Sequence, residues 1–398
     1  MFNQTQKIAI FFACVILTVG LIAMDFINPS LPYLIHGLST DQSSVQQLIV
    51  CYMIGLGVSQ FFYGTFSDNY GRKLTISIAY VISICGILLS ASAYSVEMLC
   101  ICRFITGFGS GGSTMVSRAV ISDSCHDQIT LKKGFSWFSI SSQVSPSVAP
   151  VIGGFVQQYT GSWRICFITL AIITFIALIV IRFFMPETHD IPDKKKSFIH
   201  QVLVYISLFK LRKFMSFNFI SALIYVFTIG YYCYMPFILV KLNFTPVENG
   251  AIYSVYAIFL VLGSLSLGTY LNRFNSKILF SICCVGYMLT SVFFFLYFQN
   301  ISASSTIVII IFSAILSFLC GVAAPLTLSL CLAGFNQDKG AASAVQSFIK
   351  MFFTGVALFI FNFIPLHSVV NLLECNIILS IGISVIFVAE LVLSGLMS

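Results

Sequence analysis

Long apolar stretches follow one another along the whole chain, separated by short groups of turn-forming or charged residues. The clearest breaks fall at residues 36–41, 68–73, 123–133 and 187–196. The pattern predicts twelve apolar segments, near residues 8–34, 43–64, 74–94, 97–120, 134–157, 164–185, 214–240, 248–270, 277–298, 303–330, 340–363 and 372–395.

The length of these segments distinguishes helices from strands. An α-helix needs about 20 apolar residues to cross the hydrocarbon core of a bilayer. The strands of a membrane barrel would be about ten residues long, with alternating polarity. The sequence therefore predicts an all-α membrane protein with twelve transmembrane helices.

Composition supports this fold class. Of the 398 residues, 58% are hydrophobic and only 8% are Asp, Glu, Lys or Arg, whereas about a quarter of a soluble domain is charged. So few charges cannot cover so much apolar sequence in water, which excludes a soluble enzyme, a disordered chain and a disulfide-rich secreted domain. The net charge of +7 is too sparse for a nucleic-acid surface.

Basic residues indicate the orientation in the membrane. If the N-terminus is cytoplasmic, 16 of the 20 Lys and Arg residues fall on the inner side, Arg164 and Lys241 fall outside, and Arg103 and Lys350 lie within segments. Cytoplasmic loops carry an excess of Lys and Arg. Both termini are therefore predicted to be cytoplasmic.

The longest charged stretch, residues 187–213, divides the segments into six and six. Residues 64–73 read GTFSDNYGRK, and a degenerate copy, GTYLNRFNSK, follows 204 residues later at 268–277. Both copies lie in the predicted inner loop between the second and third segment of their half, which indicates an internal duplication. We expect an N-terminal half at 1–190, a cytoplasmic linker at 191–212 and a C-terminal half at 213–398.

Four short motifs carry a resemblance to a known family. The loop at 64–73 resembles the G-x-x-x-D-x-x-G-R-[RK] signature of the major facilitator superfamily, and RFITG at 103–107 resembles its R-x-x-x-G motif. APVIGG at 149–154 resembles the antiporter motif G-P-x-x-G-G, with Ala for the first Gly, and MDFINPSLP at 24–32 is similar to a stretch of the Bcr/CflA drug-resistance branch. The resemblance implies a secondary transporter, not an enzyme, with two pseudo-symmetric halves that rock about a central site.

Two charged residues inside predicted segments are candidates for proton coupling. A charge such as Asp25 at the bilayer centre costs about 2.5–3.5 kcal/mol on insertion scales, so it usually faces a cavity and has a function. Arg103 keeps its charge and needs a partner; the resemblance implies a part in proton coupling, which makes it the leading partner for Asp25. A helix-packing Asp25 and an Arg103 that reaches the outer interface remain the structural alternatives.

Polar positions along four segments are candidates for substrate binding. In the seventh segment the spacing of three or four places one polar stripe on one helix face, which lines either a path or a packing seam. That stripe consists of Asn218, Ser221, Tyr225, Thr228 and Tyr232.

The remaining substrate-binding candidates lie in the first, fifth and eleventh segments. Asn28 follows Asp25 by three residues and is expected on the same face, and Gln143 lies on a polar stripe of the fifth segment. Gln346 and Lys350 share a face of the eleventh segment. Lys350 would either favour an anionic substrate or pair with Asp25 across the two halves.

The resemblance further implies a cytoplasmic latch, in which the loop carboxylate pairs with arginines and with a helix start from the opposite half. Its members would be Asp68, Gly71, Arg72, Arg118 and Asp123. The alternative is that Arg72 and Lys73 act only as stop signals that set the topology of the chain in the membrane. Pro150, Gly153 and Gly154, the antiporter motif, are expected to bend the fifth helix and to allow close helix approach.

Other patterns lack the context that their chemistry needs. The glycines at 107–112 have dinucleotide-binding spacing but no preceding strand, no ATP-binding P-loop occurs, and the 13 Cys form no C-x-x-C pair. We therefore expect no cofactor and no metal. His36 and Asp41 have the H-x4-D spacing of lipid acyltransferases. A membrane-embedded acyltransferase is therefore the enzymatic alternative, although the sequence has no other element that supports it.

The sequence thus predicts a proton-coupled antiporter that exports amphipathic small molecules or drugs across a bacterial inner membrane. The alternative is a transporter of the same fold for an anionic metabolite or a carboxylate siderophore, with Lys350 and Arg103 as clamps. The expected partners are the small-molecule substrate, protons and the lipid bilayer. No nucleic acid is expected, and the protein is predicted to be a monomer.

Overall fold

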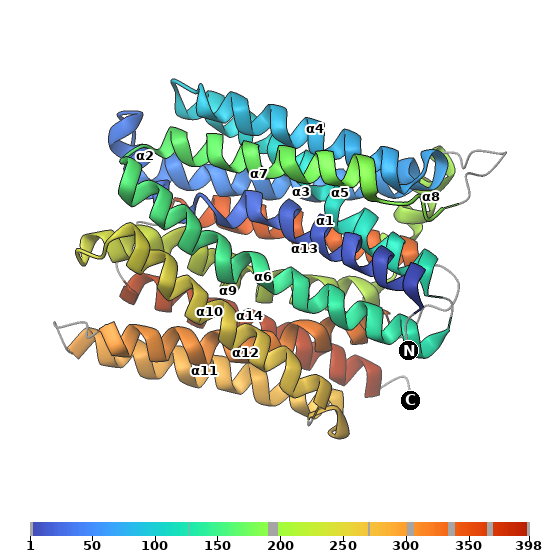
Figure 1. Ribbon diagram of the computed structural model, residues 1–398. Coiled ribbons are helices and arrows are strands. Elements are labelled where there is room, and N and C mark those ends of the chain that lie inside the picture. The colour runs from blue at the N-terminus through green and yellow to red at the C-terminus, as the bar shows by residue number, and fades with distance from the viewer. Residues whose placement is uncertain are drawn as a thin grey trace.

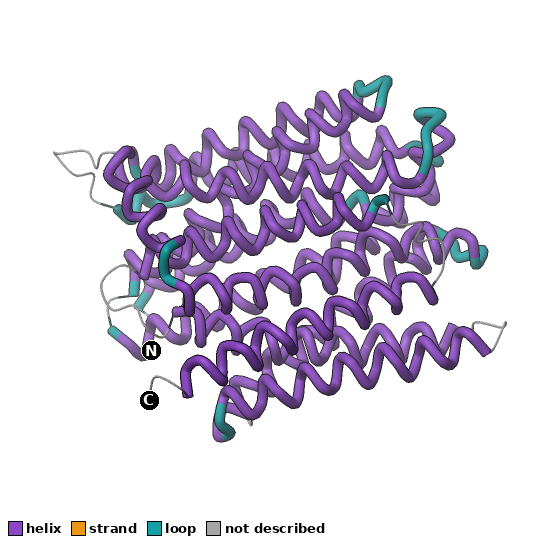
Figure 2. The backbone as a smooth tube through the Cα atoms, turned by 180° about the vertical axis from the view of Figure 1, so that it is seen from behind, coloured by secondary structure: helices purple, strands orange, loops and turns teal. Residues whose placement is uncertain are grey.

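The computed structural model describes residues 3–125, 127–189, 198–269, 271–300, 306–332, 339–363 and 369–395. Within these ranges it contains helices and short connections but no strand (Figure 2). The helices lie side by side along one direction, and the two chain ends lie at the same end of the bundle (Figure 1).

The first part of the chain forms seven helices and one 3-10 turn. They are α1 (Gln4–Asp25), η1 (Asn28–Ser30), α2 (Leu31–Gly37), α3 (Gln42–Tyr70), α4 (Arg72–Ala91), α5 (Val96–Ser124), α6 (Gln128–Thr160) and α7 (Trp163–Phe184). The first predicted segment therefore contains two helices and a turn, and the next five match one helix each.

The second part forms seven helices and a second 3-10 turn. They are α8 (Phe198–Phe209), α9 (Arg212–Lys241), α10 (Pro246–Thr269), η2 (Leu271–Arg273), α11 (Ser276–Asn300), α12 (Thr306–Leu332), α13 (Lys339–Phe361) and α14 (Val369–Gly395). Helices α9 to α14 match the last six predicted segments. Helix α8 was not predicted.

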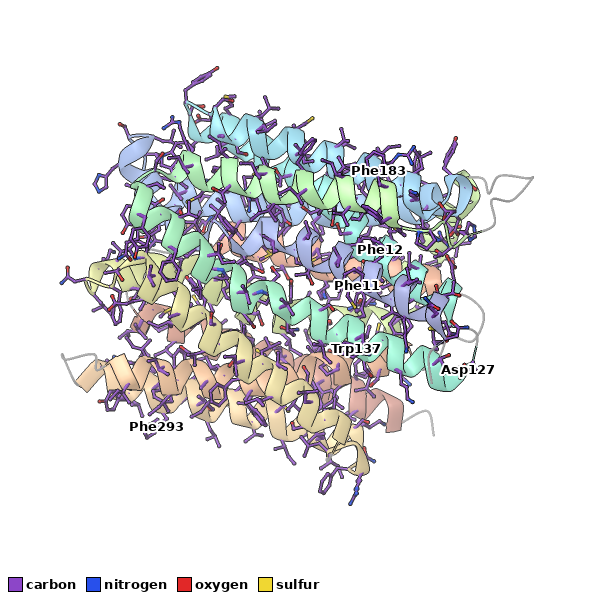
Figure 3. All side chains as sticks on the ribbon, in the orientation of Figure 1. Phe11, Phe12, Asp127, Trp137, Phe183 and Phe293 are labelled. Atoms are coloured by element: carbon purple, nitrogen blue, oxygen red, sulfur yellow. The ribbon has the colours of Figure 1, made fainter. Side chains whose placement is uncertain are left out.

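The helices have the length and surface of membrane spans. Ten segments of the described chain, α1 with α2 counted as one, are long and apolar enough to cross a bilayer. The other two long helices, α5 and α6, have 29 and 33 residues and many small polar residues, and they pack among the ten. Large apolar side chains such as Trp137, Phe183 and Phe293 are 52%, 75% and 64% exposed (Figure 3). An outer surface of this kind suits lipid rather than water.

Packing divides the bundle into two groups of helices. In the first part of the chain α5 is the central element, since it contacts α1, α3 and α4, and α7 packs on α4. In the second part α9 contacts α12, α13 and α14, while α12 also packs on α10 and α11. The division at residues 190 and 212 stays a prediction, and residues 190–197 of the expected linker lie outside the described residues.

Two helix pairs form the main contacts between the groups, α3 with α13 and α6 with α10. Glycine makes both approaches close. A methyl group added at Gly57 of α3 would lie 3.1 Å from the backbone nitrogen of Phe352 on α13. One added at Gly250 of α10 would lie 2.4 Å from the carbonyl oxygen of Pro150 on α6.

Helix α8 covers one end of the α3–α13 contact. The Tyr205 side chain is buried, and its ring centroid lies 5.2 Å from that of Phe61 on α3. Phe61 in turn lies 4.3 Å from the ring of Phe348 on α13. Part of the segment that the sequence predicted as a linker is therefore a helix that packs on both groups.

At the opposite end of the bundle, Asp41 caps the start of α3. Its carboxylate accepts hydrogen bonds from the Ser43 backbone N–H at 3.1 Å and from the Ser44 hydroxyl. Hydrogen bonds from Ser44 and Ser43 lower the pKa of Asp41 from 3.8 to about 2. The carboxylate therefore has a structural role at the helix start.

Replacing Asp41 should loosen the first turn of α3. Loss of an N-cap to alanine costs about 1 kcal/mol, whereas Asn caps as well as Asp. Asp41→Ala should therefore speed amide exchange at Ser43 about fivefold, measured by hydrogen–deuterium exchange, and Asp41→Asn should not. The cap should stabilise fully above about pH 4 and weaken as the pH falls toward 2 in the wild type alone. Equal exchange in all three proteins would contradict the cap.

Candidate functional site

The first predicted span is broken at the position of its acidic residue. Helix α1 ends at Asp25, the 3-10 turn η1 follows, and α2 resumes the direction of the chain. Pro29 accounts for the break, because it has no N–H and its ring clashes with the carbonyl four residues before it, that of Asp25. The expectation of a mid-helix Asp25 that shares a helix face with Asn28 is therefore wrong.

The Asp25 carboxylate is buried, with 5% of its surface exposed, and accepts a hydrogen bond from the Ser145 hydroxyl of α6 at 2.8 Å. Ser145 was not among the predicted residues. The predicted stripe of α6 passes beside it, so the spacing alone gave no signal for it.

Arg103 does not form the expected ion pair with Asp25 in the described chain. Its Nη1 donates to the Ala23 carbonyl at 2.9 Å, and its guanidinium lies 4.5 Å from the ring centroid of Tyr52. The reason is the broken helix. The last four carbonyls of α1 have no partner inside the helix, and a cation at a helix C-terminus is favourable. The Asp25 charge still acts on Arg103 electrostatically.

The predicted stripe of α9 contacts different helices along its length. The Asn218 side chain is buried and donates to the Phe214 carbonyl of its own helix at 2.8 Å. Tyr232 packs within an aromatic cluster, 5.2 Å from Tyr253 and 5.4 Å from Tyr256 of α10, measured between ring centroids. The two ends of the stripe are packed against protein.

The middle of that stripe meets the predicted residues of α13. Gln346 Nε2 donates to the Ser221 hydroxyl at 3.3 Å. The Lys350 ammonium lies 4.6 Å from the ring centroid of Tyr225. The structure thus brings Tyr225, Gln346 and Lys350 together. The expected pairing of Lys350 with Asp25 is absent from the described residues.

Two predicted polar residues have few partners. Asn28 is buried in η1, and its Nδ2 has no hydrogen-bond acceptor. Gln143 is half-buried on α6, and its Nε2 lies 3.5 Å from the Ser142 hydroxyl of the same helix. Neither side chain contacts the group around Lys350 through a hydrogen bond in the described part of the chain.

The turn after α3, which belongs to the motif at 64–73, is held by one buried arginine. Arg72 bonds Asp68 at 2.8 Å and Asp123 at 2.8 Å, and its Nη2 lies 3.3 Å from the His189 ring. The Glu187 carboxylate accepts from the backbone N–H of Arg72 at 2.9 Å.

Glycine at position 71 is required because its φ is +89° and a side chain there would meet Glu187. The cluster of Asp68, Arg72, Asp123, Glu187 and His189 draws on α3, α4, α5 and the segment after α7. Asp68 binds Arg72 within the first group of helices, and the expectation that it also meets a helix start of the opposite half stays a prediction.

Arg118 lies outside this cluster. Its Nη1 donates to the hydroxyls of Ser343 at 3.1 Å and Ser347 at 3.0 Å, both on α13. Among the predicted latch residues, Arg118 therefore has two hydrogen bonds to the second group of helices. The serines were missed, because nothing in a local pattern identifies the partner of a side chain across the bundle.

The antiporter-type motif lies where α6 meets both the break in α1 and the start of α10. A methyl group at Gly153 would lie 1.9 Å from the Phe26 carbonyl oxygen, and one at Gly154 would lie 2.3 Å from that of Pro246. The contact with α10 is reciprocal, since Gly250 faces the Pro150 carbonyl. Ser254 of α10 also hydrogen-bonds the Ser147 carbonyl of α6. Small residues thus allow backbone contact between helices.

The acyltransferase alternative has no support in the geometry. His36 is exposed on α2, and the Asp41 carboxylate is used by the cap of α3. No hydrogen bond joins the two side chains in the described chain.

A family model described as the Major Facilitator Superfamily matches residues 10–361. The chain belongs to the Major Facilitator Superfamily. The predicted family and fold class are confirmed, and the protein is an integral membrane protein of a transporter family.

Relatives of this superfamily member include an uncharacterised transporter and two proteins named for drug resistance. It is 25% identical over 350 residues to an uncharacterised MFS-type transporter, YdgK, of Bacillus subtilis, covering 87% of this chain and 86% of that protein. It is 28% identical over 193 residues to the bicyclomycin resistance protein homolog of Haemophilus influenzae, 47% of each chain. It is 27% identical over 176 residues to multidrug resistance protein D of Escherichia coli, 44% of each chain. The last two matches span about half of either protein.

Solved structures share the fold. A POT family transporter in complex with 5-aminolevulinic acid has a TM-score of 0.76 at 12% identity, covering 99% of this chain and 96% of that one. A D-xylose–proton symporter has a TM-score of 0.68 at 14% identity, covering 95% and 96%. At these identities the likeness shows the superfamily fold alone.

Adding one methyl group at Gly154 should separate α6 from α10. The new Cβ would lie 2.3 Å from the Pro246 carbonyl oxygen, and overpacking of this kind costs about 1–3 kcal/mol. Gly154→Ala should lower the unfolding free energy by that amount, measured by denaturant titration in detergent.

Gly230→Ala is the matched control, because its nearest neighbour, the Leu358 side chain, would be 3.8 Å away. Alanine in place of glycine inside a helix is otherwise stabilising by about 0.5–1 kcal/mol. If Gly154→Ala were as stable as Gly230→Ala, the close contact of α6 and α10 would be refuted.

Proposed function

We propose that the protein is a proton-coupled antiporter that exports amphipathic small molecules across a bacterial inner membrane. Asp25 is its proton-binding carboxylate. The observation that carries the proposal is a buried carboxylate at the break of a membrane helix, hydrogen-bonded to the hydroxyl of Ser145 at 2.8 Å. The relatives named for bicyclomycin resistance and multidrug resistance support the drug-export class.

The partner of Asp25 suits a group that changes protonation. A serine hydroxyl is both a donor and an acceptor. Ser145 can therefore donate to the ionised carboxylate and accept from the protonated one. Neither state leaves a buried polar group without a hydrogen bond, which would cost about 1–3 kcal/mol. The proton can be gained and lost without an unsatisfied site.

The position of Asp25 supports a link between protonation and movement of the two groups of helices. Ser145 binds Asp25, and Ser147, two residues further along α6, accepts a hydrogen bond from Ser254 of α10. A change at the carboxylate therefore acts on the helix that joins the groups. Each proton that moves down 100 mV supplies about 2.3 kcal/mol to this cycle.

Amphipathic substrates are supported by the side chains around Lys350. Tyr225 offers an apolar ring with a polar tip beside Lys350, and Gln346 of the same helix as Lys350 offers an amide. Aromatic side chains of this kind bind apolar bodies while their hydroxyls orient polar groups. We assign the seven predicted residues Asn28, Gln143, Asn218, Tyr225, Tyr232, Gln346 and Lys350 to this proposed path, with Tyr225, Gln346 and Lys350 at its centre.

Removing the carboxyl should abolish coupling. In proteoliposomes with an imposed pH gradient, an amphipathic aromatic compound should release protons from wild-type vesicles, followed by a pH-sensitive dye. The compound is tested as the cation tetraphenylphosphonium and as the anion 1-naphthylacetate, and release by either one supports coupling. Asp25→Asn should reduce this release to the background of empty liposomes, because an amide cannot carry the proton.

Two variants make the result specific. Asp41→Asn removes a carboxylate but keeps the α3 cap, so it should transport like the wild type. Ser145→Ala keeps the carboxyl and should retain coupling with an altered pH dependence. Proton release by Asp25→Asn with the wild-type pH dependence would refute the assignment of Asp25.

A further inference from the structure

Two basic residues lie close together at the contact between the two groups of helices. Arg118 of α5 donates through Nη1 to Ser343 and Ser347 of α13. Lys350 follows Ser347 by three residues, so it lies on the same face of α13. The two cations interact electrostatically with each other.

Neither cation has a carboxylate partner among the described residues. Arg118 bonds hydroxyls through one nitrogen, and its guanidinium lies 5.4 Å from the ring centroid of Phe138. The Lys350 ammonium faces the Tyr225 ring at 4.6 Å and donates to no described side chain.

Three described carboxylates of the first group of helices already have hydrogen-bond or ion-pair partners. Asp25 accepts from Ser145, and Asp68 and Asp123 bind Arg72. Two like charges that share a membrane-embedded site without a counter-ion are unfavourable, and cation–π contacts offset this only in part. The site therefore favours a negative charge from outside the chain.

The two basic residues are not fully enclosed by the protein. Arg118, Lys350 and Tyr225 are half-buried, whereas their neighbours Gln346 and Ser347 are buried. Within the described residues the hydrogen bonds of Arg118 use Nη1 alone. Arginine binds carboxylates through two parallel hydrogen bonds, and the lysine ammonium adds a second positive charge.

We infer that Arg118 and Lys350 bind the carboxylate of an amphipathic aromatic anion, whose apolar body packs against Tyr225. Ser343 and Ser347 hold the guanidinium in place from α13, so the ligand contacts both groups of helices. Arg103, the clamp that the sequence suggested beside Lys350, is occupied at the end of α1. The inference names the substrate class of the antiporter and, as a statement about transport, rests on the proposed function.

Binding of three probes that differ only in charge tests the inference. The probes are 1-naphthylacetate, the neutral 1-naphthylacetamide and the cation 1-naphthylmethylammonium, titrated calorimetrically into the purified full chain in a neutral detergent. A hydrogen bond to a charged group changes affinity about tenfold to a hundredfold. The acetate should bind at least tenfold more tightly than the other two.

Substitutions locate the site. Lys350→Gln and Arg118→Gln should each weaken acetate binding about tenfold or more while leaving the weak amide binding unchanged. Arg182→Gln, at an exposed cation of α7, is the control and should bind like the wild type. Because Arg118 also bonds α13, thermal unfolding must show that its variant is folded. If the Arg118 variant is not folded, Lys350→Gln alone tests the inference. Equal affinity for the three probes, or acetate binding unchanged in Lys350→Gln, would overturn the inference.

The outcome is separable from that of the proposed function. Asp25→Asn should abolish proton release and leave acetate binding intact. If only the ammonium probe released protons from wild-type proteoliposomes, the anion site would be refuted and Asp25 coupling would stand. If the acetate bound through Lys350 while Asp25→Asn kept normal proton release, the anion site would stand and the coupling would fail.

Discussion

The break in the first membrane helix determines the arrangement of the helices around it. A bilayer offers no water to backbone carbonyls, so a helix that ends inside it must find protein donors for them. Here Arg103 of α5 supplies one to Ala23, and the Phe26 carbonyl lies against Gly153 of α6. The carboxylate at the break is satisfied by Ser145, also on α6. The positions of α5 and α6 follow from these needs.

Helix α6 connects the break in α1 with the second group of helices. One of its faces meets the broken end of α1, and the other meets the start of α10 through the reciprocal glycines Gly154 and Gly250. Backbone contact leaves no side chain to absorb a shift, so movement at one face is transmitted to the other. Physical coupling between a carboxylate and an interface requires a connected element of this kind.

Charge is distributed unequally between the ends and the middle of the molecule. Arg72 is surrounded by two carboxylates and a histidine ring within one group of helices, which makes a local brace. The contacts between groups use glycines, serines and aromatic rings. Within the described residues no ion pair crosses them. Separation of these contacts would break no ion pair of the described residues, but Arg118 of α5 would lose its two serine partners on α13.

The sequence by itself determined the class of the protein, its helices and its family. Hydrophobicity is a local property, so every long segment was visible without a partner, and the loop at 64–73 and the glycines of α6 identified the superfamily. The broken first helix was visible only as Pro29, and α8 was hidden in a stretch that composition marked as a linker.

Tertiary structure decided which side chains meet. Arg103 took a backbone carbonyl instead of Asp25, because the helix end offered unpaired acceptors where the sequence suggested a continuous helix. Asp25 found Ser145, and Arg118 found two serines of α13. Such pairings depend on the crossing of helices far apart in the chain. No spacing within one helix encodes them, because the partner lies on another helix.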